Sequence, residues 1–158
     1  KQGEVGEIRV RGETVMKGYW NNPDETAEIL SANGWLRTGD LGHLDEKNRL
    51  FISGGRKKDL IIRGGENVSP LAIENALMSH PAIVEVAAVG IPDERAGEKV
   101  KVFVVLREGA EANDQELKQL CRKKLPAFMI PDIFQFIELL PKTATGKILK
   151  SELRALAS

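Results

Sequence analysis

Several features that mark whole classes of protein are missing from this sequence. Its single cysteine, Cys121, excludes an internal disulfide and favours a reducing, cytoplasmic setting. Lys and Arg number 23 together, as do Asp and Glu, so there is no basic excess for binding nucleic acid. The longest apolar runs, such as residues 83–91, are far too short to cross a bilayer. We therefore expect no nucleic-acid partner and no transmembrane segment.

The composition that remains is that of a globular protein. The 158 residues are 42% hydrophobic and 29% charged, which suits one domain, or a small domain with part of another. The chain begins with Lys1 rather than Met, and a strand-like segment follows almost at once. We expect a further region upstream of Lys1, where a leader peptide stays open as an alternative.

The first part of the chain has the pattern of a small β-rich region. Ile8 and Val10 alternate with charged residues, as in a half-buried strand. Asn22 followed by Pro23 is typical of a helix start and predicts a helix over about residues 23–32.

A predicted hairpin is followed by a change in amino-acid composition. Residues 42–44 and 49–53 flank a polar, turn-rich connection, which indicates two paired strands. Residues 54–59 then combine glycines and charges without an apolar anchor. This composition is typical of a boundary between independently moving bodies.

The second part has the pattern of an α+β domain with helices on a small sheet. The expected elements are a hairpin unit around residues 60–68, a helix from Ser69 that Pro81 ends, strands over 83–91 and 99–106, a helix after Asn113 with Leu117, Leu120, Cys121 and Leu125 on one face, a strand near 134–137 and a last helix containing Leu153 and Leu156. The order β-α-β-β-α-β-α predicts one compact domain.

Two polar clusters in the first part are candidates for binding a nucleotide. Asp40 follows Gly39 in what we expect to be a turn, where a carboxylate can accept two hydrogen bonds from vicinal hydroxyls. Arg56 offers paired donors in a fixed plane for ribose or phosphate oxygens. The alternatives are a turn aspartate that caps its own backbone and a solvated charge run.

Two more clusters lie in the second part. Gly64 and Gly65 leave room for a narrow ligand arm close to the backbone, although a glycine pair in a hairpin also serves simply as a turn. Residues 141–148 hold Lys142 and Lys147 in a polar loop, where a lysine can reach a phosphate or remain a solvated side chain.

These clusters, taken in order, resemble a known family. Segments 6–12, 18–20, 35–40, 55–59, 64–67, 125–131 and 141–150 are similar to successive motifs of the adenylate-forming superfamily, which includes acyl-CoA synthetases, luciferases and peptide-synthetase adenylation domains. The resemblance covers essentially the whole chain and is to the C-terminal portion of an acyl-CoA synthetase. It implies that residues 1–57 are the β-rich end of the large adenylation domain and residues 58–158 the mobile C-terminal lid.

The resemblance assigns roles to the candidate residues. Asp40 and Arg56 would bind the ribose of ATP or AMP, and Lys58 would be the hinge, with Asp59 as the neighbouring alternative. Gly64 and Gly65 would line the tunnel for the pantetheine arm of CoA. Lys147 would be the catalytic lysine of adenylation, whereas Lys142 and Lys150 are expected to face solvent.

The implied reaction is that of an acid–thiol ligase of the fatty-acid–CoA ligase type. A carboxylate attacks the α-phosphate of ATP to give acyl-AMP and pyrophosphate, and CoA then displaces AMP to form the thioester. The phosphate loop, the acyl pocket and the Mg²⁺ ligand of the family would lie upstream, in an N-terminal body outside this chain. We therefore expect no metal site here, and no activity from the chain alone.

Two other functions stay open at this stage. The parent protein could load a carrier protein instead of CoA, through the same lysine chemistry. Alternatively, the chain could be a non-catalytic interaction module that uses the exposed faces of residues 1–57.

Overall fold

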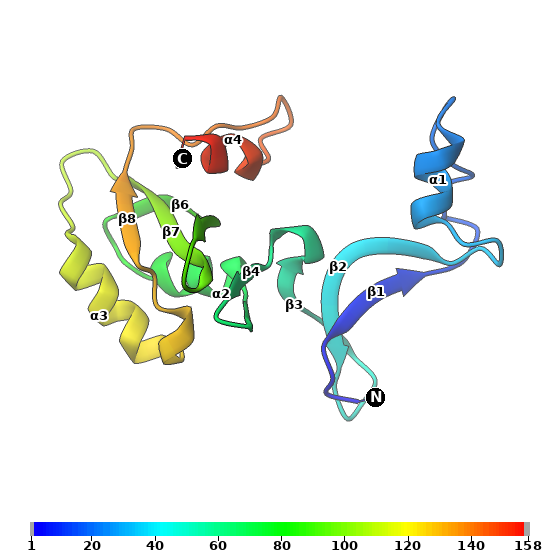
Figure 1. Ribbon diagram of the computed structural model, residues 1–158, viewed down its shortest axis with the longest axis horizontal. Coiled ribbons are helices and arrows are strands. Elements are labelled where there is room, and N and C mark those ends of the chain that lie inside the picture. The colour runs from blue at the N-terminus through cyan, green and yellow to red at the C-terminus, as the bar shows by residue number, and fades with distance from the viewer. Residues whose placement is uncertain (1, 157–158) are drawn as a thin grey trace. The chain divides into compact units, whose positions relative to one another are not determined.

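The computed structural model describes residues 2–156, apart from the side chains of residues 53 and 54. The chain divides into two compact units, Lys1–Lys58 and Asp59–Ser158. In Figure 1 the first unit runs from blue to cyan and the second from green to red. Each unit is described by itself below.

The first unit is a three-stranded antiparallel sheet with one short helix. The strands β1 (Gly6–Val10), β2 (Leu36–Leu44) and β3 (Leu50–Arg56) lie in the order β1-β2-β3. The helix α1 (Pro23–Ile29) begins where the Asn22 side chain accepts the backbone N–H of Glu25. It ends earlier than residue 32, since Leu30 turns extended and forms a β-bridge with Leu36.

The candidate segment around Asp40 lies in a strand, so the prediction of a turn there is wrong. β2 starts at Leu36 rather than at residue 42, and it includes Gly39 with a φ of +75°. The pairing with β3 shifts register between Asp40 and Gly42, as at a β-bulge. β3 likewise continues to Arg56 and is followed by a short 3₁₀ turn, η1 (Lys57–Asp59), so residues 54–56 are strand and not linker.

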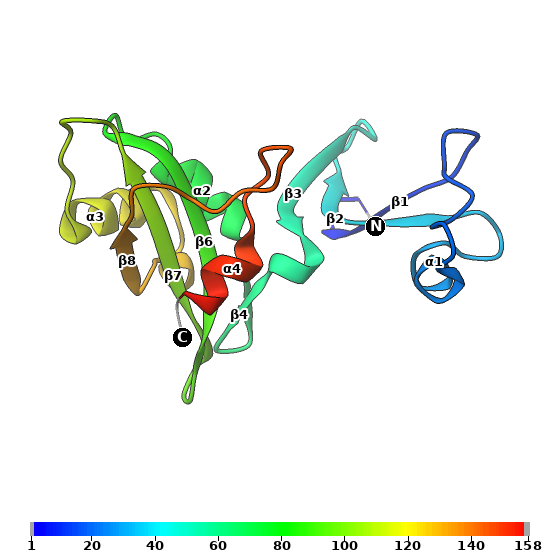
Figure 2. The same ribbon diagram turned by 90° about the horizontal axis from the view of Figure 1, so that it is seen from above.

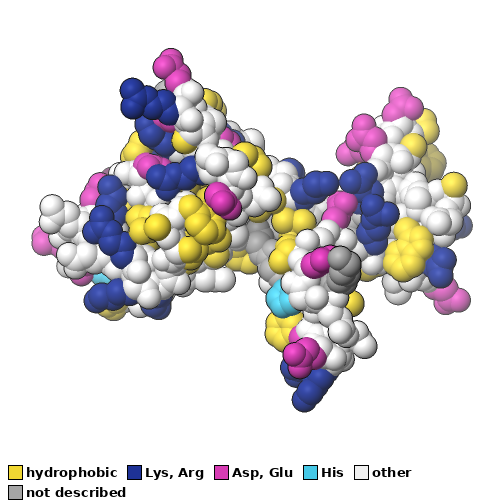
Figure 3. Space-filling model, turned by 60° about the horizontal axis from the view of Figure 1, so that its bottom comes forward, with side chains coloured by type: hydrophobic (Ala, Val, Ile, Leu, Met, Phe, Trp, Pro, Cys, Tyr) yellow, Lys and Arg dark blue, Asp and Glu magenta, His cyan; other side chains and the backbone are white. Residues whose placement is uncertain are grey.

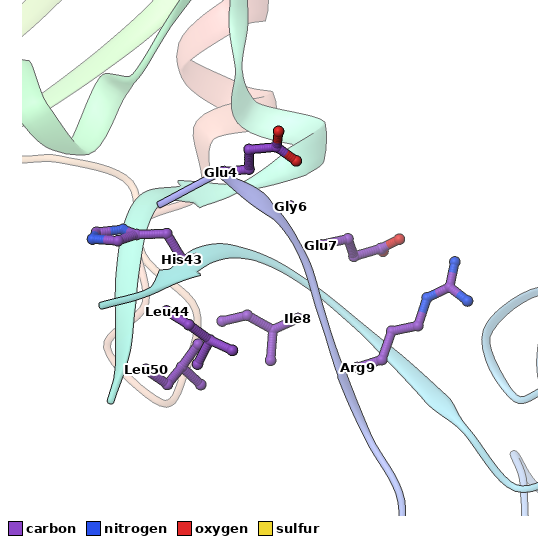
Figure 4. A pocket seen from close by; sticks show the side chains of 9 residues that line it. Glu4, Gly6, Glu7, Ile8, Arg9, His43, Leu44 and Leu50 are labelled. Atoms are coloured by element: carbon purple, nitrogen blue, oxygen red, sulfur yellow. The ribbon is translucent and has the colours of Figure 1, made fainter. Parts of the chain in front are cut away.

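The described side chains of the first unit form no buried apolar core. Among the described side chains, every buried hydrophobic residue lies at Ile61 or beyond. Figure 4 shows Ile8, Leu44 and Leu50 gathered beside a shallow hollow, while Glu7 and Arg9 extend away from them. Leu44 and Leu50 are nevertheless 41% and 55% exposed. One side of this sheet is therefore apolar and uncovered.

The second unit is an α+β domain, as predicted. Its sheet has the order β5-β4-β7-β6, and β8 runs parallel to β7. The strands are β4 (Ile61–Arg63), β5 (Glu66–Val68), β6 (Ile83–Asp93), β7 (Gly97–Leu106) and β8 (Ile133–Phe136). The helices are α2 (Pro70–Leu77), α3 (Asp114–Lys124), the 3₁₀ turn η2 (Ala127–Met129) and α4 (Lys150–Ala155). Leu125 and Leu156 follow α3 and α4 as C-caps instead of extending them.

Both faces of the β6–β7 pair are buried, because successive side chains of a strand point to opposite faces. Val86 and Ala88 of β6 join a core with residues of α2 and α3. Their neighbours Ala87 and Val89 join a second core with Leu140 and Leu153, the last of which lies in α4. Figure 2 shows α2 and α4 on opposite sides of these strands.

No helix within residues 2–156 has the length and apolar character needed to cross a membrane. Figure 3 shows hydrophobic side chains interspersed with charged ones on the visible face of each unit.

The buried thiol of Cys121 gives a test of the second unit's core. Burial raises the pKa of this thiol from 9.0 to about 11. The unfolded chain loses this proton near 9.0 and the folded chain near 11, so stability is full below pH 9 and falls as the pH rises between these values. The free energy of unfolding should fall by about 2–3 kcal/mol over this range.

We expect urea unfolding between pH 8 and pH 11 to show this loss in the wild-type chain. The Cys121→Ala variant should lack it, and the difference between the two chains removes the contribution of other titrating groups. Parallel pH profiles for the two chains would contradict the prediction.

Candidate functional site

Asp40 and Arg56 lie opposite each other on neighbouring strands. They are register partners of β2 and β3, and the Arg56 Nε to Asp40 Oδ1 distance is 3.7 Å. The two side chains are 55% exposed for Arg56 and 41% exposed for Asp40. An exposed pair at this distance is only weakly joined. Both groups can therefore turn to a ligand at little cost.

The backbone at Asp40 is held by the neighbouring threonine. The Thr38 hydroxyl donates to the carbonyl of Ile8 at 2.9 Å and accepts the N–H of Asp40 at 3.1 Å. An open hollow lies beside this segment, and Asp40 is not among its lining residues. It is lined by Glu7, Tyr19, Glu25, Glu28, Ile29, Arg37, Thr38, Gly39, Arg56, Lys57 and Lys58.

The junction between the units falls after Lys58. Asp59 belongs to the second unit, where its Oδ1 accepts a hydrogen bond from Arg154 of α4 at 3.2 Å. Lys58 is exposed and forms no ion pair with another described residue. Asp59 is thus fixed to one body, which leaves Lys58 as the nearer candidate for a hinge.

Gly64 and Gly65 form the two-residue turn between β4 and β5. Their φ angles are +58° and +84°, and the flanking Arg63 and Glu66 are register partners. Two consecutive positive φ values are typical of a type I′ hairpin turn, which explains the glycine pair. A Cβ on either residue would meet nothing within 4 Å. The backbone here is therefore open to an approaching ligand.

The loop joining β6 to β7 supports this turn. The Gly64 N–H donates to the carbonyl of Ala96 at 2.7 Å. Asp93 Oδ1 accepts the N–H groups of Arg95 and Ala96, and the adjacent Lys99 ammonium bonds to the same carboxylate. The hydrogen bond from Lys99, with that from Ala96, lowers the pKa of Asp93 to about 2. The Asp93 carboxylate that holds this loop is therefore ionised at neutral pH.

Lys147 lies in a tight hairpin-like loop. Thr143 N–H donates to the Lys147 carbonyl at 2.8 Å, and Gly146 N–H donates to the Thr143 carbonyl at 2.9 Å. The Thr143 hydroxyl accepts the Lys147 N–H at 3.1 Å. Gly146 completes the loop with a φ of +83°, a conformation that favours glycine. The backbone of Lys147 is thus held on both its N–H and its carbonyl.

Three lysines of this region have different surroundings. Lys142 forms an ion pair with Glu85, and Lys150 forms one with Glu74 at 2.7 Å. The Lys150 side chain is only 18% exposed, so the prediction that Lys142 and Lys150 face solvent is wrong for Lys150, and Lys142 is also paired. By contrast, the ammonium of Lys147 is exposed and forms no ion pair or side-chain hydrogen bond with another described residue. It is the lysine of the three that is available to a ligand.

The structure brings some predicted residues together and separates others. Asp40 and Arg56 are adjacent in the first unit, while Gly64, Gly65 and Lys147 lie in the second. Within residues 2–156 no three His, Cys, Asp or Glu side chains gather as a metal site.

The sequence analysis missed the ionic partners that hold the two loops. Arg63 contacts Asp132 and Lys150 contacts Glu74, across 69 and 76 residues of sequence. Each is next to a motif, but nothing in the sequence indicates which acidic residue it meets.

Comparison with known proteins identifies the fold. Residues 72–147, from α2 to the candidate lysine, match the AMP-binding enzyme C-terminal domain. The o-succinylbenzoate–CoA synthetase of Bacillus subtilis, in complex with AMP, superposes with a TM-score of 0.90 at 37% identity over 98% of this chain. Residues 72–147 therefore belong to the AMP-binding enzyme C-terminal domain family, and the structural neighbours of the chain are adenylate-forming enzymes. The predicted resemblance to adenylate-forming enzymes is confirmed.

The sequence relatives of this chain include CoA ligases. The long-chain-fatty-acid–CoA ligase of Bacillus subtilis is 50% identical over 95% of the chain, and the sulfoacetate–CoA ligase of Cupriavidus necator is 46% identical over 96%. The chain spans 26% and 30% of the length of these two relatives, and 31% of the synthetase structure.

The geometry around Asp40 predicts weak nucleotide binding by this chain. Asp40 and Arg56 are half-exposed, loosely paired and on an open surface, so they offer ATP few fixed contacts. These contacts compensate for little of the entropy that ATP loses on binding. We expect calorimetric titration of ATP into residues 1–158 to show weak or undetectable binding. A dissociation constant in the micromolar range would show the prediction to be wrong.

Proposed function

We propose that this chain is the C-terminal part of an ATP-dependent acyl-CoA synthetase. Residues 1–57 would be the β-rich end of its large adenylation domain, and residues 58–158 its mobile lid. The observation that carries the proposal is the free ammonium of Lys147 on a loop whose backbone is fixed, between two lysines that are ion-paired. The substrates would be a carboxylic acid, ATP and CoA.

The uncovered sheet of the first unit supports a missing N-terminal body. Leu50 and Ile52 of β3 are 55% and 65% exposed, and no described hydrophobic side chain before Ile61 is buried. A sheet of this kind needs cover for its apolar side. The relatives are three to four times as long as the chain, and the additional sequence would form such a body. The phosphate loop, the acyl pocket and the Mg²⁺ ligands would belong to it, and the isolated chain would be inactive.

The names of the relatives favour CoA over a carrier protein as the acceptor. They are less informative on the acid. Relatives that are 50% and 46% identical to the chain are named for a long-chain fatty acid and for sulfoacetate. Similarity over these residues is thus shared by ligases that are named for different acids. A fatty acid is proposed from the more similar of the two, and a cytoplasmic location from the single unpaired Cys121.

In the first step Lys147 would stabilise the negative charge of the reacting phosphate. The carboxylate attacks the α-phosphate of ATP, a bond to phosphorus forms, and pyrophosphate leaves. An ammonium held beside the phosphate offsets the negative charge that builds up there and orients the carboxylate. Hydrogen bonds with Thr143 fix the backbone from which the Lys147 side chain extends. Less conformational entropy is therefore lost when the ammonium is placed for the reaction. Asp40 and Arg56 would hold the ribose.

The second step would use the other loop. The thiol of CoA attacks the acyl carbonyl and AMP leaves as the thioester forms. The open backbone at Gly64 and Gly65 would let the narrow pantetheine arm pass. The glycine turn belongs to strands packed in the first core, whereas Leu140 and Ile148 anchor the lysine loop in the second. A reorientation about Lys58 would then present each loop in turn to one bound adenylate.

Replacing Lys147 tests the proposed function directly. In the complete protein that contains this chain, Lys147→Ala should lower the rate of acyl-AMP formation by about 10²–10³, because the compensating charge is lost. Thioester formation from supplied acyl-AMP should be unchanged. Pyrophosphate release and CoA consumption measure the two steps separately. Lys123→Ala, which removes an exposed lysine of α3, is the matched control and should alter neither. Equal loss in both steps would count against the role of Lys147.

Replacing Gly65 tests the tunnel. Gly65→Leu should leave acyl-AMP formation intact and block thioester formation, because the side chain would fill the space above the turn. The substitution also strains a backbone with a φ of +84°. Gly109→Leu imposes the same strain at a φ of +72°, in similarly open space, and should spare both steps. Retained thioester formation in Gly65→Leu would refute the assignment.

A further inference from the structure

One edge of β7 is shared by two short strands. β4 pairs with β7 at Gly97, and β8 pairs with it from residue 101 onward. Asp132 fills the interval between them. Its N–H donates to the carbonyl of Val100, and its Oδ2 accepts the Val100 N–H, both at 2.9 Å. Asp132 thus continues the hydrogen-bond ladder along this edge of β7, in the interval that neither β4 nor β8 reaches.

Arg63 joins the other oxygen of the same carboxylate. Its Nη2 donates to Asp132 Oδ1 at 2.7 Å, and its Nη1 donates to the carbonyls of Ile130 at 2.8 Å and Phe128 at 3.3 Å. The two ionic side chains are 25% and 22% exposed. A guanidinium that is charged and shared among three acceptors makes a strong, directional contact. Arg63 immediately precedes Gly64, so this contact fixes one end of the glycine turn.

A second ion pair lies at the open edge of β6. Glu74 of α2 accepts the Ala88 N–H at 2.9 Å and the Lys150 ammonium at 2.7 Å, both on Oε1. These side chains are 17% and 18% exposed, so they are less screened by water than surface pairs. Lys150 is the first residue of α4 and follows the lysine loop directly. The contact therefore fixes the C-terminal end of the loop that carries Lys147.

The two ion pairs share no residue, and the loops they hold are anchored in different cores of the sheet. We propose that they are separate latches, one for each half-reaction. Arg63 with Asp132 positions the Gly64–Gly65 turn for thioester formation, and Glu74 with Lys150 positions Lys147 for acyl-AMP formation. The proposal rests on the proposed function, because it needs both loops to work in the two steps. All four are positioning residues, since they act through the loops.

The first test uses the complete protein and isosteric variants, each of which is the control for the other. Asp132→Asn should lower thioester formation from supplied acyl-AMP about tenfold or more, because a displacement of the turn on the order of 1 Å misaligns the thiol. It should leave acyl-AMP formation within about twofold. Glu74→Gln should show the reverse pattern. Lys150→Arg keeps the charge and should recover most of the adenylation rate that Lys150→Met loses.

The second test reads position without activity. Hydrogen exchange of residues 1–158 should be faster at Gly64 and Gly65 in Asp132→Asn, with no change at Gly146 and Lys147, and the reverse in Glu74→Gln. A merely destabilised core would instead speed exchange throughout β6 and β7.

The outcomes separate the latches from the function on which they rest. If the wild-type protein is active in both steps but each variant loses both equally, or exchange at the loops does not respond, the latches are refuted alone. If the wild-type protein forms no acyl-AMP, the proposed function is refuted together with the roles of the loops.

Discussion

The antiparallel pair of β6 and β7 is the element on which the rest of the second unit depends. Ten register pairs join the two strands, from Ile83 with Leu106 to Asp93 with Gly97. Because the side chains alternate, the same pair supplies Val86 and Ala88 to one core and Ala87 and Val89 to the other. A rigid two-faced ribbon can therefore carry two different loops without either loop packing on the other. Its edges then matter, because each edge exposes backbone groups that Asp132 and Glu74 satisfy.

Charge pairing distinguishes the candidate lysine from its neighbours. Lys142 and Lys150 flank Lys147 within nine residues, and without the family resemblance the residue types alone do not rank one of the three above the others. In the structure Glu85 and Glu74 neutralise the outer two, and the loop bonds hold only the backbone of the third. An ammonium that has a carboxylate partner would have to give it up before it could stabilise a phosphate. Lys147 has no such cost within the described residues.

The sequence predicted those parts of the fold that depend on local patterns. The strand expected over residues 99–106 and the helix expected after Asn113 appear as β7 and α3. The segment at Gly39 was assigned wrongly because a glycine before an aspartate suggests a turn, while the strand accommodates its positive φ where the pairing of β2 with β1 shifts register between Arg37 and Leu41. Lys150 was assigned to solvent because its partner Glu74 lies 76 residues away. Register and long-range ion pairs are set by tertiary packing, which periodicity does not encode.

The separation of the two loops bears on how one small domain could serve two chemical steps. The glycine turn lies at the end of strands whose Ile61 and Val68 are buried in the first core, and the lysine loop is joined to the second core through Leu140. Two loops fixed to one body in this way keep a set separation, so local adjustment would not exchange one for the other at a bound adenylate. Under the proposed function the body itself would have to turn, and Lys58, an exposed residue at the end of the first unit, suits a hinge because Asp59 is already tied to α4. The firm anchoring of each loop therefore supports the proposed reorientation: a domain whose loops are fixed would serve two steps only by moving as a whole.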